Sequence, residues 1–494
     1  MPSHPILLID IDGLRPDVFQ RLLEAGRLPN FARLFGSQGL PQGWLSPVLA
    51  PAPSITFASQ ASLFTGAHPA VHGITGNQFF DRFGLSNGGK PRMYAFDVGD
   101  TLGMDDAVEV FSNGLASHYL QAPTLYEQLS GRLGKTVVVG HMISRGAGEW
   151  LPPSVINLAR LTKGGSLFGL DAADFDRRTL KNALDYLDKN GLPGLLTVYF
   201  MGVDHESHRH GPQAQGTYLA DVLDGLVGEL WDAIEQSHTA GEPILVAVFS
   251  DHGQIAVPAD DRHSLRLAFP FERELLPLFD ALGRDVNDKP KEGALTDAVV
   301  ASNGGIAQVY LRPIDSAWDT PPDFDLDVLP VGRTFWEAHE HGRYTPDLEG
   351  ALSAVLVRCE EQEGWGSSYR ALTPQGDLLS LEDWFNAQPA GLYVDPVHRS
   401  SNLAGKTSGD LLVLSDYSRG FYFAAPVAGV HGGLHPDDSF ATLAIGLPGA
   451  EKASLEQTRR HFEGAVSDRC RAEGGRQPST ADLVPGLLAV IAGW

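Results

Sequence analysis

The sequence predicts an α/β fold, with a mostly parallel central sheet sandwiched by helices and an inserted cap subdomain. Three observations lead to this prediction. Short, continuously apolar runs recur along the chain, as expected of strands that are covered on both faces. Segments of helical periodicity lie between many of these runs, which is the order of an α/β protein. Two stretches break the alternation and are interpreted as insertions.

The predicted strands are rich in Val, Ile, Leu and Phe at consecutive positions rather than at alternate ones. That pattern favours burial on both faces over a sheet with one wet face. The strands are residues 6–11, 136–141, 195–201, 244–250, 306–311, 410–415 and 440–446. Glycine and proline are spread along the chain as turn punctuation.

The predicted helices occupy several of the segments between the strands. They are residues 21–35, 122–133, 176–190 and 216–236. In the last of these, an apolar stripe recurs at three- and four-residue steps, which is typical of a helix that packs on a sheet. The stripe consists of Leu219, Leu223, Leu226, Leu230 and Ile234.

Residues 78–115 and about 256–409 fit this alternation poorly. We interpret the first as a small insertion, and the second, rich in Pro, Gly, Trp and charge, as a cap subdomain. The catalytic core is then predicted to comprise residues 1–255 and 410–494. A chain of 494 residues is long for a single hydrophobic core, which agrees with this division.

The composition excludes several classes of function. No apolar run approaches the roughly 20 residues of a membrane helix, so no membrane association is expected. A net charge of -24 would repel a nucleic-acid polymer, although bound dications would still admit a small phosphate ester. No signal segment is recognisable, and two cysteines, Cys359 and Cys470, are too few for a disulfide framework, so a cytoplasmic location is expected.

Carboxylate and imidazole side chains follow three of the predicted strands, and one more histidine lies between glycines near the C-terminus. They are Asp12, Asp204, His208, Asp251, His252 and His431. Ligands of an open α/β sheet bind at the carboxyl ends of its strands, so these side chains are expected to converge. Oxygen and imidazole ligands suit zinc, manganese or iron. The sequence therefore predicts a metal site at this edge of the sheet.

Each of these residues also has a simpler interpretation. Asp12 precedes a predicted helix and is a good N-cap, and Asp251 is a suitable cap for a loop. Asp204 and His208, four residues apart, also fit a solvated first helical turn. Three strands that all end in ligand-type residues by chance are much rarer, and this coincidence favours the metal site.

The same reasoning predicts a nucleophile in the segment 51–77. A proline-marked turn precedes a segment of small and apolar residues at 57–64 that is predicted to be helical, with Thr56 at its start. A helix N-terminus attracts anions, and a hydroxyl beside a dication has a lowered pKa. Thr56 is also a plausible N-cap, and Ser54, Ser59 and Ser62 compete for the role, so spacing alone does not choose.

At this point the ordered motifs resemble a known family. The motifs are "IDIDGLRPD", "TFASQASLFTGAHPAVHGITGN", "VDHESHRHGP", "FSDHGQ", "SNGGIAQVYL" and "GVHGGLHP". They resemble the alkaline phosphatase superfamily and, within it, the type I phosphodiesterase/nucleotide pyrophosphatase branch. The resemblance implies an alkaline phosphatase-like fold and two divalent metal ions, usually zinc, with manganese or iron as alternatives.

The resemblance also implies roles for individual residues. It assigns one metal to Asp12, Thr56, Asp251 and His252, and the other metal to Asp204, His208 and His431. It selects Thr56 as the nucleophile, which would form a covalent phosphothreonine intermediate.

Two departures from the family concern substrate binding. Relatives commonly carry an asparagine three residues after the nucleophile, where this chain has Ser59 followed by Gln60. In "MISRGAGEW", Arg145 stands where some monoesterases place a lysine and an arginine for a terminal phosphate. We take Ser59, Gln60, Arg145 and Asn77, which closes the nucleophile motif, as candidate substrate contacts.

The predicted function is a dinuclear metal-dependent phosphodiesterase or nucleotide pyrophosphatase that acts on a small phosphate ester. The missing monoesterase lysine favours a diester. A phosphomonoesterase of the alkaline phosphatase type and a phosphonoacetate hydrolase, which residues 65–81 also resemble, are the alternatives on the same metals. An inactive metal-binding sensor or scaffold is the alternative of a different class.

Overall fold

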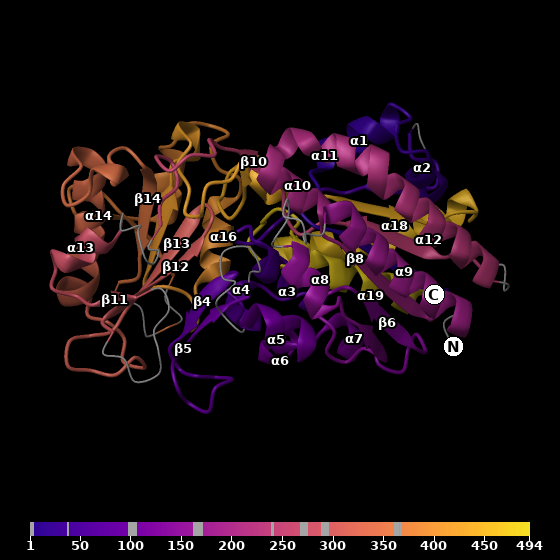
Figure 1. Ribbon diagram of the computed structural model, residues 1–494, viewed down its shortest axis with the longest axis horizontal. Helices are drawn as coiled ribbons and strands as arrows, with labels where there is room; N and C mark the ends of the chain where they lie inside the picture. Colours follow the sequence, from indigo (N-terminus) through magenta and orange to yellow (C-terminus); the bar gives the residue numbers. More distant parts are fainter. Residues whose placement is uncertain are drawn as a thin grey trace.

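The computed structural model describes residues 4–36, 39–96, 106–161, 171–238, 242–266, 275–287, 296–359, 365 and 368–494. These residues form an elongated molecule with a larger lobe, which contains both chain ends, and a smaller lobe built around β12 (Ala298–Asn303), β13 (Ile306–Leu311) and β14 (Leu352–Val357) (Figure 1). Each lobe has a sheet of its own. Among the described residues, no helix combines the length and the apolar character needed to cross a bilayer.

The sheet of the larger lobe has seven strands, and its central part is parallel. Their order is β2 (Gly43–Leu45), β20 (Leu443–Gly446), β9 (Leu245–Phe249), β1 (Ile6–Ile11), β8 (Leu195–Phe200), β6 (Thr136–Val139) and β7 (Glu149–Leu151). The pairs from β9 to β7 are parallel, and only β20 and β2 are antiparallel to their neighbours. The predicted mostly parallel sheet is confirmed.

Helices cover both faces of this sheet, and strand β1 shows why its sequence is continuously apolar. Ile6 and Leu8 face the core formed with α3 (Thr56–Thr65) and α19 (Leu483–Gly493). The intervening Leu7 and Ile9 face the opposite core, which contains Leu180 of α9 (Ala172–Asn190) and Leu230 of α12 (Asp224–Ser237). Because successive side chains of a strand point to opposite faces, burial on both faces requires apolar residues at every position.

The sheet of the smaller lobe is mostly antiparallel. Its order is β11 (Val286–Asn287), β12 (Ala298–Asn303), β13 (Ile306–Leu311), β17 (Leu411–Ser415), β14 (Leu352–Val357), β15 (Arg370–Leu372) and β16 (Leu378–Leu379). Residues 410–415, which the sequence analysis placed with the catalytic core, therefore belong to the second sheet. Their alternate side chains enter two cores of the smaller lobe, so they are as apolar as a strand of the central sheet.

Several predicted helices are shorter or interrupted. The predicted helix at 21–35 is two helices, α1 (Pro16–Glu24) and α2 (Pro29–Phe35), because Gly26 has a positive φ of 68° between them. Only α7 (Leu125–Gln128) forms within residues 122–133. The segment 78–115 contains a hairpin of β4 (Gln78–Asp81) and β5 (Arg92–Ala95), followed by short helices.

Candidate active site

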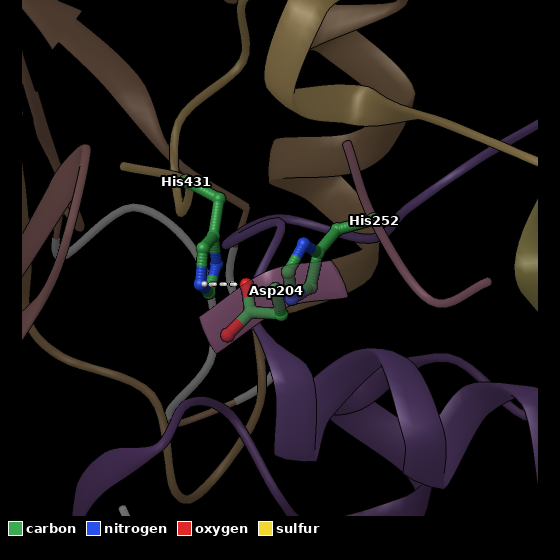
Figure 2. A group of neighbouring side chains, drawn as sticks. All are labelled: Asp204, His252 and His431. Atoms are coloured by element: carbon green, nitrogen blue, oxygen red, sulfur yellow. Dashed lines mark ion pairs between the residues drawn. The ribbon is translucent and has the colours of Figure 1, made fainter. Parts of the chain in front are cut away.

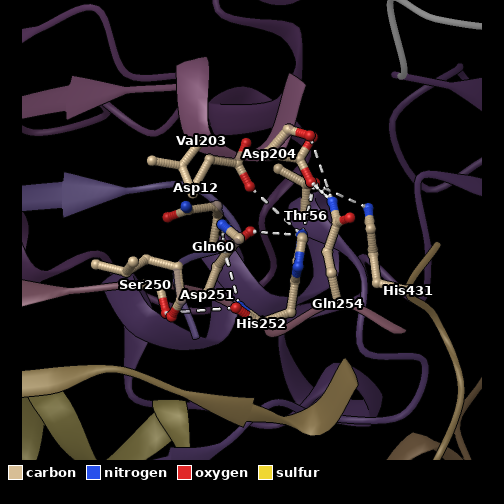
Figure 3. Close-up of polar contacts among 12 residues, drawn as sticks. Asp12, Thr56, Gln60, Val203, Asp204, Ser250, Asp251, His252, Gln254 and His431 are labelled. Carbon is tan, nitrogen blue, oxygen red and sulfur yellow. Dashed lines mark hydrogen bonds and ion pairs between the residues drawn. The ribbon is translucent and has the colours of Figure 1, made fainter. Parts of the chain in front are cut away.

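The predicted ligand residues lie together at the carboxyl ends of the parallel strands (Figure 3). Asp12 directly follows β1, and Asp251 and His252 follow β9. Helix α10 (Gly202–His210) begins after β8 and carries Asp204 and His208. His431 follows the short strand β18 (Gly429–Val430). Since β9, β1 and β8 run in parallel, their ends meet at one edge of the sheet, as predicted.

Asp12, Asp251 and His252 form one cluster, which we call the strand-end group. His252 Nε2 lies 3.4 Å from Asp12 Oδ1 and 3.3 Å from Asp251 Oδ2. The ligand atoms of the three residues all lie within 4.8 Å of one another, and all three side chains are buried. The group is therefore compact enough to hold one cation.

Asp204, His208 and His431 form a second cluster, which we call the helix-and-loop group. Asp204 Oδ2 lies 3.3 Å from His208 Nε2, and Asp204 Oδ1 lies 3.6 Å from His431 Nε2. His252 connects the two groups, because it also lies within ligand range of Asp204 and His431 (Figure 2). The rings of His252 and His431 stack, with centroids 3.6 Å apart.

The three histidines share one orientation. Each directs Nδ1 at a backbone carbonyl, which requires a proton on Nδ1 and leaves a lone pair on Nε2. The acceptors are the carbonyl oxygens of Gly253 for His252 at 2.8 Å, Gly429 for His208 at 2.8 Å and Ser54 for His431 at 3.1 Å. All three Nε2 atoms therefore face the site as acceptors.

This arrangement brings acceptors together with no proton between them. Nε2 of His208 and Nε2 of His431 are 3.1 Å apart. Asp12 Oδ1 and Asp251 Oδ2 are buried and have no hydrogen-bond partner within the described part of the chain. Burial, together with the charge of Asp251, raises the pKa of Asp12 well above its usual value. Buried acceptors of this kind are costly unless a cation lies between them, so the residues fit bound metal.

Thr56 is the first residue of α3, and its hydroxyl reaches this cluster. Its Oγ1 lies 3.2 Å from His252 Nε2. Ile55 occupies the N-cap position and makes no side-chain cap, so Thr56 is not the N-cap of α3. Of the competing hydroxyls, Ser54 donates to the Gly433 carbonyl and Ser62 to the Ala58 carbonyl, both within the protein framework. The structure thus places the Thr56 hydroxyl against the cluster, and its role as nucleophile stays a prediction.

Comparison with known proteins identifies the family. Residues 6–331 match the sequence profile of type I phosphodiesterase / nucleotide pyrophosphatase. The chain belongs to this family. It is therefore a phosphoester hydrolase of the alkaline phosphatase superfamily, as the motifs predicted. Members of the family generally depend on two metal ions, and the two clusters are candidate sites for them.

Solved structures share the fold of this family member at low sequence identity. Murine ectonucleotide pyrophosphatase / phosphodiesterase 5 superposes with a TM-score of 0.52 at 14% identity, covering 93% of this chain and 95% of that chain. An inactive variant of the murine protein in complex with AMP superposes with a TM-score of 0.52 at 14% identity, covering 93% of this chain and 94% of that chain. The human protein superposes with a TM-score of 0.54 at 14% identity, covering 93% of this chain and 95% of that chain. These likenesses confirm the alkaline phosphatase-like fold.

Asn77 lies beside the first turn of α3. Its Oδ1 accepts a hydrogen bond of 2.9 Å from the N–H of Phe57, the residue after Thr56. The amide is thereby held against the first turn of α3. An asparagine thus contacts this turn from position 77, whereas relatives commonly carry one three residues after the nucleophile, where this chain has Ser59.

The other candidate substrate contacts differ from Asn77. Ser59 and Gln60 are fully buried; Gln60 Oε1 lies 2.9 Å from His141 Nε2, whereas Gln60 Nε2 has no hydrogen-bond partner among the described residues, so a substrate contact by Gln60 stays a prediction. The role of Ser59, whose hydroxyl has no partner among the described residues, stays a prediction.

The guanidinium of Arg145 is held by protein acceptors. All of its guanidinium N–H groups have protein acceptors: the carboxylate of Glu127 and the carbonyls of Ser117, Leu120 and Ala122. A substrate contact by Arg145 stays a prediction, and it would require the guanidinium to leave these acceptors. The sequence shows the charge of this residue, but it does not show that the backbone carbonyls of residues 117–122 accept its N–H groups.

Two residues that contact the ligand groups escaped the sequence analysis. Tyr199 of β8 donates its hydroxyl proton to Asp12 Oδ2. Gln254 donates from Nε2 to Asp204 Oδ1 (Figure 3). Tyr199 lies inside an apolar strand and carries no local signal. Gln254 closes the motif "FSDHGQ", and its place next to His252 is the one hint that the sequence offers.

Proposed function

We propose that this chain is a dinuclear metal-dependent phosphodiesterase of the nucleotide pyrophosphatase type, acting through a covalent phosphothreonine intermediate on Thr56. The observation that carries the proposal is the Thr56 hydroxyl, which lies 3.2 Å from His252, and His252 belongs to two sets of side chains that could each hold a cation. A nucleophile, an anion-attracting helix start and two sets of ligands then occupy one site.

The donor set supports two divalent ions of the zinc type. Asp12, Thr56, Asp251 and His252 would hold one ion, and the helix-and-loop group would hold the other. Oxygen and imidazole donors without thiolate suit zinc, with manganese and iron as alternatives. When bound, two such ions supply positive charge that stabilises the phosphoryl group during an in-line displacement.

The chain's own residues then divide the reaction between them. Thr56 Oγ1 attacks phosphorus, the bond to the leaving oxygen breaks, and the phosphoryl group remains on the threonine. Asn77 offers Nδ2 to a phosphate oxygen, because Oδ1 is already occupied by the Phe57 N–H. Water then cleaves the phosphothreonine and regenerates the Thr56 hydroxyl. The protein mainly positions groups and balances charge.

A diester is the favoured substrate class. Arg145, the one basic candidate for a terminal phosphate, is fully engaged with protein acceptors. The murine neighbour was solved with AMP as an inactive variant, which supports a nucleotide-containing ester for this chain. The substrate proposed is therefore a small nucleotide-like phosphodiester.

The test compares bis-p-nitrophenyl phosphate with p-nitrophenyl phosphate for the wild type and Thr56→Ala, each with and without a metal chelator. We expect preference for the diester, loss of turnover on chelation, and a loss of about 1000-fold or more in Thr56→Ala. Thr65→Ala, at the opposite end of the same helix, is the matched control and should keep wild-type turnover.

Acid quenching during turnover, followed by peptide mass spectrometry, tests the intermediate directly. An aryl phosphoryl adduct on the peptide containing Thr56 is expected from the diester. Undiminished turnover of Thr56→Ala, or a clear preference for the monoester, would overturn the proposal. Equal and negligible turnover of both proteins in the presence of metal would favour the sensor or scaffold alternative.

A further inference from the structure

Gln254 lies between the two ligand groups and touches both of the segments that carry them. It follows His252 by two residues and is fully buried. Its Nε2 donates to Asp204 Oδ1 on helix α10 and lies 3.4 Å from the Asp204 carbonyl oxygen (Figure 3). One side chain therefore spans from the end of β9 to the helix-and-loop group.

The backbone around Gln254 extends this connection to the remaining ligands. Strand β10 (Ile255–Ala256) follows Gln254 directly and pairs antiparallel with β18 (Gly429–Val430), which precedes His431. The Gln254 carbonyl accepts a hydrogen bond of 3.0 Å from Arg15 Nη1, in the segment that follows Asp12. The segment 254–256 is thus hydrogen-bonded to the segments that precede His431 and follow Asp12.

A donor at this position matters because the terminal torsion of an aspartate side chain is soft. Without a partner, the Asp204 carboxylate samples a broad range of orientations, and binding a cation then costs the entropy of fixing one of them. His208 lies against Oδ2 of this carboxylate, and Gln254 holds Oδ1. An amide also donates without adding positive charge, which would oppose a dication.

We propose that Gln254 is a positioning residue, which orients the Asp204 carboxylate and thereby raises the metal affinity of the helix-and-loop group. The inference rests on the proposed function, because it assumes that this group holds an ion. Removal of an outer partner of a metal ligand typically lowers metal affinity by about 10- to 100-fold.

The packing around Gln254 argues against a purely structural role. Its Oε1 is buried without a hydrogen-bond partner among the described residues, which disfavours the folded state. A Cβ at Gly429 would lie 2.6 Å from this oxygen, so the glutamine side chain also requires glycine at that position. A methionine of similar shape lacks the unpaired oxygen, and the metal-free protein should tolerate it well.

The experiment measures stepwise Zn²⁺ affinities of the metal-free full chain by competition with a chromophoric chelator. Wild type is expected to bind two ions, and His208→Ala identifies the step that belongs to the helix-and-loop group. In Gln254→Met we expect the affinity of that step to fall about 10- to 100-fold, with the other step changed by less than about threefold. The Co²⁺ absorption spectrum of the same step should change with it.

Gln308→Met is the matched control. Gln308 is an equally buried glutamine of β13, and its amide donates to the Thr75 carbonyl and accepts from the Gly409 N–H. This variant should lose thermal stability and keep both Zn²⁺ affinities, whereas Gln254→Met should keep the thermal stability of the metal-free protein and lose one affinity.

Three outcomes would overturn the inference. Wild-type affinities at both steps in Gln254→Met would exclude a positioning role, while leaving the proposed function intact. Equal weakening of both steps, together with a stability loss like that of Gln308→Met, would make Gln254 a structural residue. Failure of the wild type to bind two ions would remove the proposed metal centre and the inference with it.

Discussion

The strand-end group and the helix-and-loop group use the same kinds of side chain on different supports. Asp12 and Asp251 directly follow central strands, and Asp251 Oδ1 accepts hydrogen bonds from the N–H groups of Gly13 at 3.1 Å and His252 at 3.0 Å. Asp204 and His208 instead lie on one helix, four residues apart. The first group is fixed by the backbone of the sheet, and the second depends on how a helix is docked.

The two groups also differ in exposure to solvent. The side chains of Asp251 and His252 are 0% exposed, whereas those of Asp204 and His208 are 15% and 31% exposed. Burial raises the pKa of Asp251, because its carboxylate is removed from solvent. Water can therefore reach the helix-and-loop group, whereas burial in the strand-end group leaves Asp12 Oδ1 and Asp251 Oδ2 without a hydrogen-bond partner among the described residues.

This difference indicates an unequal pair of metal positions. An ion in the strand-end group is enclosed and neutralises two carboxylates, each of which has one oxygen without a hydrogen-bond partner among the described residues, so we expect it to bind more tightly and to exchange more slowly. An ion in the helix-and-loop group is reached by solvent through His208, so we expect it to dissociate first on dialysis against a chelator. The following predictions test that inequality.

The largest effect is expected for His252→Ala, because His252 lies within ligand range of both groups. The variant should lose both ions and at least about 1000-fold in kcat/KM on a phosphodiester. Metal content by mass spectrometry after dialysis, measured beside turnover, checks both parts. His72→Ala, which removes another buried histidine that contacts Ser62, should lose stability but keep two ions. Retention of either ion by His252→Ala would contradict the shared role.

A smaller effect is expected for His208→Ala, which affects the helix-and-loop group alone. The variant should retain one ion per chain, held by the strand-end group, and lose about tenfold or more in kcat/KM. His210→Ala, at an exposed histidine on the same helix, is the matched control and should retain two ions. Loss of both ions from His208→Ala would show that the two groups bind metal as one unit.

The two groups also differ in how far the sequence predicts them. Asp12 and Asp251 were predictable because a buried apolar run that ends in a carboxylate is rare without a ligand, and parallel strands end at one edge. Asp204 and His208 offered only a four-residue spacing on a helix. Gln254 escaped prediction because its partner Asp204 is 50 residues away, and such contacts depend on tertiary packing.

The fold shows the same limit. Strand positions were predictable from apolar runs, but sheet membership was not, and residues 410–415 were assigned to the wrong sheet. An apolar run reports burial on two faces, and both sheets of this molecule bury their central strands in that way. Which strands pair with one another depends on contacts between segments that are far apart in the sequence, and these contacts leave no local signal.

A third prediction concerns the docking of the helix that carries Asp204. Asp176 of α9 accepts hydrogen bonds from the N–H groups of Met201 and Gly202, both at 3.2 Å, and from the Tyr218 hydroxyl at 2.8 Å. It thus serves as a cap from a neighbouring helix for α10, which has no side-chain cap of its own. Burial raises the pKa of Asp176 to about 7.

The sign of the pH effect follows from this pKa. The unfolded pKa is about 3.9, so the folded protein binds the proton more tightly. The stabilisation is present in full below about pH 4 and is lost as the pH rises through about 7. Between pH 5 and pH 8, Asp176 should lower the stability of the metal-free protein by about 2 kcal/mol.

Thermal unfolding at several pH values checks this prediction. Asp176→Asn should flatten the fall in Tm between pH 5 and pH 8, whereas Asp185→Asn, at an exposed position of the same helix, should follow the wild type. Parallel profiles for all three proteins would contradict the role assigned to Asp176. A flattened profile would show that the helix-and-loop group rests on a titratable support.

The smallest effect on catalysis is expected for Arg145→Ala, because this arginine belongs to neither group. Its N–H groups bind Glu127 and the carbonyls of Ser117, Leu120 and Ala122, so its loss should lower stability by about 1–3 kcal/mol. Turnover of both p-nitrophenyl esters should stay within about twofold of wild type once the protein is folded, because no donor of Arg145 is left for a phosphate. A selective loss of monoester turnover would mean that Arg145 leaves its carbonyls when substrate binds, and a terminal phosphate would then be the group that both metal positions serve.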